Sequence, residues 1–159
     1  MYINMMKSKY LIFGILILVI AGIILISGCI QQAPQESNQQ QENLINANLD
    51  TQFQLKINQI AFIESDNFKI EFLNVAEDYR CPSDVICIWE GQATIVVNIL
   101  KNDQNLGDFS LTSRAAHEDL AVKNFDGYSI KLIKVIPYPK TTQKIEISDY
   151  IVTLVVSKI

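Results

Sequence analysis

Only a few residues of this 159-residue chain could do chemistry through a thiol or an imidazole, because it holds three cysteines and one histidine. Cys81, Cys87 and His117 would supply three ligands for a zinc ion, although the cysteines are spaced more widely than in a zinc knuckle. The same spacing differs from the Cys-x-x-Cys motif of thioredoxin-like proteins. A metal site and a redox-active dithiol therefore remain alternatives to a disulfide between Cys81 and Cys87.

Carboxylates are the other candidates for chemistry. Glu77–Asp78 and Glu118–Asp119 are adjacent in sequence, and on a strand adjacent side chains point to opposite faces, so neither pair forms a dyad by itself. The chain has no Gly-x-Ser-x-Gly elbow, phosphate-binding glycine loop or His-Glu-x-x-His motif. We therefore expect no enzyme, no catalytic residue, no cofactor and no metal. A carboxylate enzyme would need two of these acids, or Glu90, to converge in a cleft with raised pKa values.

The first 28 residues have the order of a secretory signal or membrane segment. Lys7 and Lys9 precede an uncharged apolar run, Tyr10–Ile26, and the small residues Ser27 and Gly28 follow it. With Cys29 next, the segment resembles a prokaryotic lipobox, which implies cleavage and lipidation of Cys29. The alternative is an uncut hydrophobic helix of about 26 Å, short for a bilayer core of about 30 Å. Both predict a cell-membrane protein whose remaining residues lie on the extracytoplasmic face.

Residues 29–50 are predicted to hold the lipid-anchor cysteine and a flexible tether. This segment is rich in Gln and Asn and shows no sustained apolar period, so it cannot bury enough apolar surface to offset its ordering entropy. A short helix that begins with Leu44, Ile45 and Leu49 is the alternative. The extracytoplasmic domain is then expected over residues 51–159.

Within residues 51–159 the hydrophobic period changes to two, which is typical of strands with one buried face. Turn residues separate the apolar runs, most clearly at 65–67, at 102–105 and at Asp126–Gly127. We expect an all-β, immunoglobulin-like β-sandwich of about seven strands, with a small barrel as the alternative. At most one turn of helix is expected, within 112–120. The clearest strand patterns lie at 53–57, 68–72, 94–100, 130–136 and 150–156.

The charge balance excludes one class of partner. The 131 residues after the first 28 hold all 17 acids and 11 of the 13 bases, so their net charge is 11 − 17 = −6. Such an acidic body lacks the basic surface that binds the phosphate backbone, so no nucleic-acid partner is expected.

The stretch 77–91 is the most distinctive part of the chain. Once Cys29 is assigned to lipid, Cys81 and Cys87 remain as a pair, and outside the cytoplasm such a pair most simply forms a disulfide. We expect Trp89 to be structural, packed on the disulfide or on a sheet face, whereas an exposed Trp89 would indicate a contact site. The charged neighbours are interpreted either as solvated loop charges, with Arg80 paired to one of the acids, or as a contact loop formed with Trp89: Arg80, Asp84 and Glu90.

The string Arg-Cys-Pro, four residues, Cys, any residue, Trp, any residue, Gly spans Arg80–Gly91. It resembles a motif in a family of small secreted proteins and lipoproteins of prokaryotes. The resemblance extends from Phe68 to Val156 and includes Gly127–Ile130, Pro137–Pro139 and Asp149–Tyr150. It implies a β-domain and a location outside the cytoplasm, but no activity and no catalytic residues.

These features predict a membrane-anchored, non-enzymatic binding or envelope-interaction module. Its partners would be the membrane, through lipid or the N-terminal helix, and an unidentified protein or envelope ligand. The alternatives are an inhibitor of a secreted enzyme that uses the Cys81–Cys87 loop and, less favoured, an enzyme or thiol-redox protein. An inhibitor predicts a protruding loop, whereas an enzyme predicts a pocket lined by converging polar groups.

Overall fold

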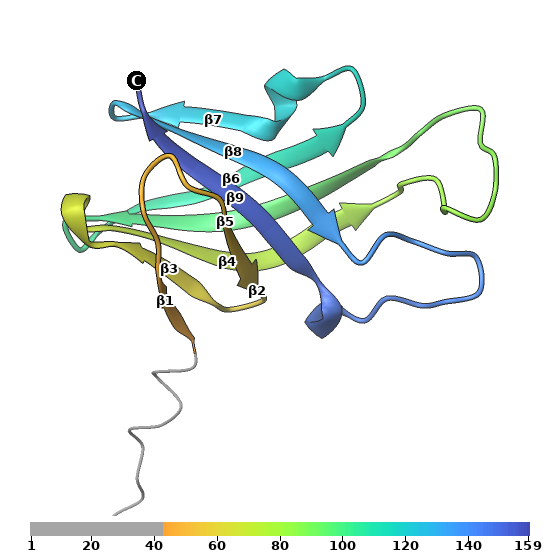
Figure 1. Cartoon of the computed structure of the whole chain (residues 1–159), viewed down its shortest axis with the longest axis horizontal. Coiled ribbons are helices and arrows are strands. Elements are labelled where there is room, and N and C mark those ends of the chain that lie inside the picture. The colour runs from red at the N-terminus through yellow and green to blue at the C-terminus, as the bar shows by residue number, and fades with distance from the viewer. Residues whose placement is uncertain (1–42) are drawn as a thin grey trace, which may run out of the picture. The chain divides into compact units, whose positions relative to one another are not determined.

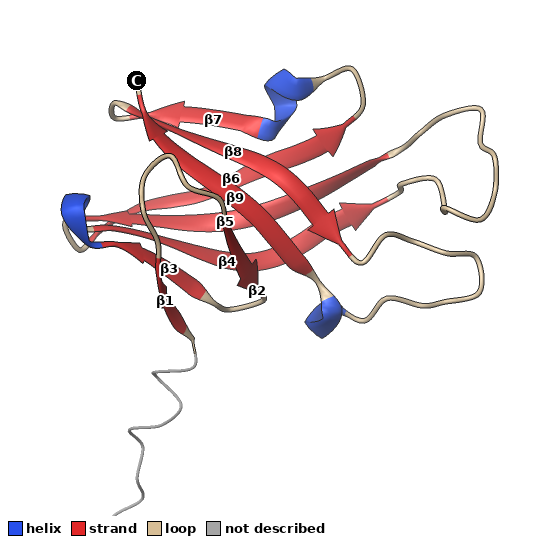
Figure 2. Ribbon diagram, in the orientation of Figure 1, coloured by secondary structure: helices blue, strands red, loops and turns tan. Residues whose placement is uncertain are grey.

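The computed structural model describes residues 43–159, which form nine strands in two sheets (Figures 1 and 2). Neighbouring strands pair antiparallel except for β1 and β3, which are parallel. In spatial order the first sheet holds β1 (Leu44–Asn46), β3 (Ile60–Ile63), β4 (Phe68–Asp78), β5 (Gln92–Lys101) and β6 (Gln104–Arg114). The second holds β2 (Phe53–Lys56), β9 (Ile151–Lys158), β8 (Tyr128–Ile136) and β7 (Val122–Phe125).

Short 3-10 helices occupy Glu64–Asp66, Glu118–Ala121 and Ile147–Asp149. Over residues 43–159 no helix has both the length and the apolar character needed to cross a membrane. The predicted signal segment, lipidation of Cys29 and most of the tether lie outside the described residues.

Each long strand forms because apolar and polar residues alternate with the period of the pleat. In β4, Phe68, Ile70 and Phe72 are buried, while Lys69 and Glu71 between them stay partly exposed. Every strand pattern expected from the sequence coincides with a strand of the structure. The all-β prediction is therefore confirmed.

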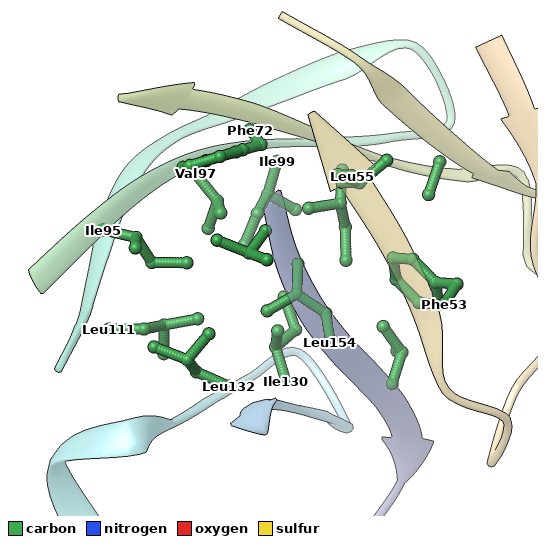
Figure 3. Close-up of a cluster of buried hydrophobic side chains, with 14 of the residues drawn as sticks. Phe53, Leu55, Phe72, Ile95, Val97, Ile99, Leu111, Ile130, Leu132 and Leu154 are labelled. Carbon is green, nitrogen blue, oxygen red and sulfur yellow. The ribbon is translucent and has the colours of Figure 1, made fainter. Parts of the chain in front are cut away.

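The core lies between the two sheets, where apolar side chains from both interleave (Figure 3). Burying this apolar surface is the dominant favourable contribution to folding, and it holds the sheets face to face. Because the core holds the sheets together, the loops at the ends of the strands can carry residues that do not contribute to it. The side chains labelled in Figure 3 are Phe72, Ile95, Val97, Ile99 and Leu111 of the first sheet and Phe53, Leu55, Ile130, Leu132 and Leu154 of the second.

The predicted turns are also confirmed. Asn102 and Asp103, which join β5 to β6, both have positive φ (51° and 61°), as do Asp126 and Gly127 between β7 and β8 (44° and 79°). Positive φ at both central residues matches the right-handed twist of the flanking strands, and Asn, Asp and Gly tolerate it best.

The boundaries differ from the prediction at two places. β1 lies inside the segment 29–50 expected to be tether, so the folded part begins before residue 51. Ile60 N–H donates to Asn43 O (2.6 Å) and Ala47 N–H donates to Phe62 O (2.9 Å), which holds β1 at the sheet edge. A three-residue strand is too short to show a period in the sequence. The second place is the segment 112–120, where one turn of helix was expected. There β6 continues to Arg114, and a single 3-10 turn follows at Glu118–Ala121.

Candidate interaction site

Cys81 and Cys87 form a disulfide, as predicted, with an S–S distance of 2.09 Å and Cα atoms 6.0 Å apart. Sulfurs bonded to each other do not supply the thiolates that the zinc alternative requires. Within residues 43–159 no group of three His, Cys, Asp or Glu side chains is arranged to hold a metal ion.

The disulfide closes the connection between β4 and β5, residues 79–91, which we name the disulfide loop. It lies at the same end of the two sheets as the connection between β8 and β9, at the right of Figure 1. Ser83 N–H donates to Pro139 O (2.9 Å), and the Thr141 hydroxyl and amide donate to the Asp84 carboxylate (2.5 and 3.0 Å). These bonds lower the pKa of Asp84. Asp84 thus fastens the loop to its neighbour instead of forming a free contact group.

Arg80 is only 8% exposed, so the prediction that it belongs to the contact surface is wrong. Its guanidinium pairs with Asp78 at 2.5 Å and donates to Val135 O (2.7 Å) and Pro137 O (2.9 Å). The Tyr150 hydroxyl donates to the same carboxylate at 3.0 Å. Burial opposes ionisation of Asp78, but the Arg80 bonds and charge, with the Tyr150 bond, outweigh it and lower the pKa of Asp78. This buried pair ties the end of β4 to β8 in the other sheet.

Tyr150, which donates to Asp78, is expected to make the stability of the domain depend on pH in the alkaline range. Burial, with the charge and hydrogen bond of Asp78, raises the pKa of Tyr150 to about 12. In the unfolded chain the phenol loses its proton near pH 10 (about the ordinary value), so folding is opposed as pH rises from about 10 to about 12. We expect the free energy of unfolding to fall over this interval and to fall less in Tyr150→Phe, as measured by urea unfolding. The exposed Tyr138→Phe serves as the control, and an equal fall in Tyr150→Phe would contradict the assignment.

The loop returns to β5 through Gly91, which the sequence motif contains. Tyr79 N–H donates to Gln92 O (2.8 Å) and Cys81 N–H donates to Glu90 O (2.9 Å), so the two arms of the loop run side by side at its base. Gly91 has a φ of +74°, and a Cβ there would overlap Tyr79 O. Only glycine therefore fits this position without a shift of the backbone.

The outer part of the disulfide loop is apolar and exposed. The side chains of Ile86 and Ile88 are fully exposed (102% and 110%), and those of Val85 and Trp89 are about half exposed (46% and 51%). We name these four residues the apolar tip. Trp89 was expected to pack on the disulfide or on a sheet face, but it is half exposed, and the Arg114 guanidinium lies over its ring, 5.8 Å from the ring centroid. This exposure is the alternative that indicates a contact site.

A signal for the tip was present in the sequence. Val85–Trp89, Val-Ile-Cys-Ile-Trp, is a continuous apolar run of five residues that begins inside the Cys81–Cys87 ring and continues two residues beyond it, within a stretch bounded by Pro82 and Gly91. An apolar run that belongs to neither a strand nor a helix does not pack against the core as part of a sheet or helix face, so its side chains can stay exposed. An interpretation that rests on the charged residues and the tryptophan of this loop misses Ile86 and Ile88.

A pocket of about 550 Å³ lies beside the loop, lined among others by Pro82, Glu90, Arg114 and Tyr138. Its second arginine is Arg80, which the carboxylate of Asp78 already engages. The exposed His117 lines a smaller hollow with Trp89 and Arg114.

The acids expected of a carboxylate enzyme have separate partners. Glu77 accepts from Gln92 Nε2 (2.5 Å) and Thr94 Oγ1 (2.9 Å), whereas Glu118 pairs with Lys131 (3.0 Å). The pKa of Asp78 is lowered, not raised. Glu77, Asp78 and Glu118 thus have different partners, and the pKa of Asp78 is shifted in the direction opposite to that of a general acid.

Comparisons with protein-family models, with curated proteins and with solved structures found no significant match. The function is therefore inferred from the disulfide loop and from what its exposed side chains can bind.

Proposed function

We propose that this protein is a membrane-anchored, extracytoplasmic and non-enzymatic binding module that contacts its partner through the apolar tip. The observation that carries the proposal is the full exposure of Ile86 and Ile88 on one short loop. Exposed apolar side chains gathered at one place are typical of interaction sites, because leaving them in water is unfavourable.

The way in which the loop is held supports the same function. The disulfide, the Asp84–Thr141 bonds and the Asp78–Arg80 pair fix the loop from three sides. A loop that is already ordered loses less conformational entropy on binding, which increases its affinity. We interpret the fold as an immunoglobulin-like sandwich, an architecture that presents loops at its ends for recognition.

The location is proposed from the sequence. Lipidation of Cys29 after the apolar run Tyr10–Ile26 would anchor the chain and place the domain outside the cytoplasm. A disulfide such as Cys81–Cys87 persists in that oxidising compartment.

Photo-crosslinking in the full-length chain tests the proposal. A photoreactive amino acid is placed at Ile88 and, as a matched control, at Ile159, an exposed isoleucine whose amide bonds to Gly127 O beside the β7–β8 turn. β8 leads from that turn to the loop end, so the two positions lie at opposite ends of this strand. After irradiation of cell membranes, we expect a specific product from Ile88 that Ile159 does not give.

Identical products from both positions, or none from Ile88, would refute the binding function. A secreted enzyme as the product at Ile88 would instead support the inhibitor, which the rigid, exposed loop also suits.

A further inference from the structure

We propose that the partner of the apolar tip is the lipid bilayer itself, and that Ile86 and Ile88 insert into its interfacial region. The proposal rests on the proposed function and names its partner. The domain would then have two membrane contacts: the N-terminal segment and, at one end of the sheets, the disulfide loop.

The chemistry of the tip favours lipid over a protein groove. Val85–Trp89 carries no charged side chain, and its two fully exposed residues are aliphatic. Trp, Tyr and Arg dominate the binding energy of protein interfaces, and the two fully exposed residues of the tip, Ile86 and Ile88, are none of these. Insertion into a bilayer interface strengthens with the apolar area that is buried, which two isoleucines on an exposed loop provide.

Aromatic side chains stand next to the aliphatic ones. Trp89 ends the tip, Tyr79 is exposed at the base of the loop, and Tyr138 is exposed on the neighbouring β8–β9 connection, lining the same pocket as the loop. Trp and Tyr collect at membrane interfaces because their rings are apolar at one end and polar at the other. Exposed aliphatic side chains with exposed aromatic ones near them suit a loop that enters a bilayer.

The backbone of the loop limits the depth of insertion. The hydrogen bonds that join its two arms lie at its base, at Tyr79–Gln92 and Cys81–Glu90, and Val85 N–H donates to Pro82 O (3.2 Å). A peptide group without a partner is costly in hydrocarbon, so amides further out in the loop must keep water. Insertion is therefore confined to side chains at a depth of about 5–10 Å, as for interfacial helices.

A link of limited length to the N-terminal segment would keep the domain close to the membrane. Residues 27–43, which are 17 residues, separate the apolar run from β1. As a flexible chain they would reach roughly 20–25 Å on average, and at most about 60 Å when fully extended. Once the N-terminal segment is in the membrane, the second contact becomes intramolecular, and even weak insertion is favoured by the high effective concentration.

The net charge of the domain predicts how anionic lipid affects insertion of the tip. Residues 43–159 hold 11 bases and 15 acids, a net charge of 11 − 15 = −4, and the tip adds no basic patch. Attraction to anionic lipid therefore cannot drive the contact. We expect insertion into zwitterionic vesicles, little sensitivity to salt, and no gain from anionic lipid.

Trp89 is the only tryptophan of the chain, so its fluorescence reports on the tip without labelling. The full-length protein is reconstituted in phosphatidylcholine vesicles, with and without bromine on the acyl chains, and iodide serves as an aqueous quencher. We expect a blue-shifted emission, quenching by brominated acyl chains and protection from iodide. All three are expected to be lost in the Ile86→Asp/Ile88→Asp variant and retained in Ile159→Asp.

The N-terminal segment would keep every variant on the vesicles, so the signal reports contact of the tip and not attachment. The unfolding midpoint of the double variant should match the wild type, because neither side chain is buried in the domain. A Trp89 that stays open to iodide and insensitive to bromine, or that inserts only into anionic vesicles at low salt, would overturn the lipid proposal. If Ile88 then crosslinks a protein, the binding module stands with a different partner, and if it crosslinks nothing, both proposals fall.

Discussion

Replacing Arg80 by methionine is expected to lower the free energy of unfolding by about 3–5 kcal/mol. The change keeps apolar bulk but leaves the buried Asp78 carboxylate without its counter-charge. It also removes the donors to Val135 O of β8 and to Pro137 O, just after β8. An uncompensated charge in a protein interior costs far more than a well-formed pair contributes. Denaturant unfolding of the full-length chain, followed by circular dichroism, measures the effect.

Two further variants make this result specific. Glu118→Gln breaks a salt bridge with Lys131 that is largely exposed, and should change stability very little. Arg80→Lys should recover only part of the loss, because an ammonium cannot reproduce the planar fork that engages the carboxylate and two carbonyls. A loss in Arg80→Met no larger than that in Glu118→Gln would show that the pair does not tie the sheets together.

Replacing Gly91 by alanine is expected to destabilise the domain by about 3 kcal/mol or more, because two costs add. An L-residue in the left-handed region costs about 1–2 kcal/mol, and Gly91 has a φ of +74°. In addition, the new Cβ would overlap Tyr79 O and lie 2.8 Å from the Cα of Arg80. The backbone that carries the buried arginine would therefore have to move. Thermal unfolding and the near-UV signal of Trp89 report the change.

Gly127→Ala is the matched control for this prediction. Gly127 has almost the same φ, +79°, but nothing lies within 4 Å of the position its Cβ would take. It should therefore show the conformational cost alone, about 1–2 kcal/mol. If the two alanine variants lose the same stability, the close approach at Gly91 contributes nothing and the motif glycine needs another explanation.

Much of the fold was predictable because its signals are local. The alternation in β4 and β8 predicts strands, and Asn102–Asp103 and Asp126–Gly127 predict turns from their own backbone preferences. The Cys81–Cys87 disulfide was predictable from an elimination that used only the count of cysteines and the expected compartment. The edge strand β1 was not, because three residues cannot display a period and its pairing partner is 16 residues away, at Ile60 for Leu44.

The candidate site depended on the tertiary structure. Arg80 and Asp84 are charged residues of a polar loop, which by itself predicts exposure, yet their partners Val135, Pro137 and Thr141 are 55 to 57 residues away in the chain. Trp89 is the kind of residue that usually packs inside, yet it is half exposed. The physical reason is that burial is decided by what the rest of the chain places beside a residue. The β8–β9 connection lies beside the charged part of the loop, where Pro137 O accepts from Arg80 and Thr141 donates to Asp84. The described residues leave the apolar tip uncovered.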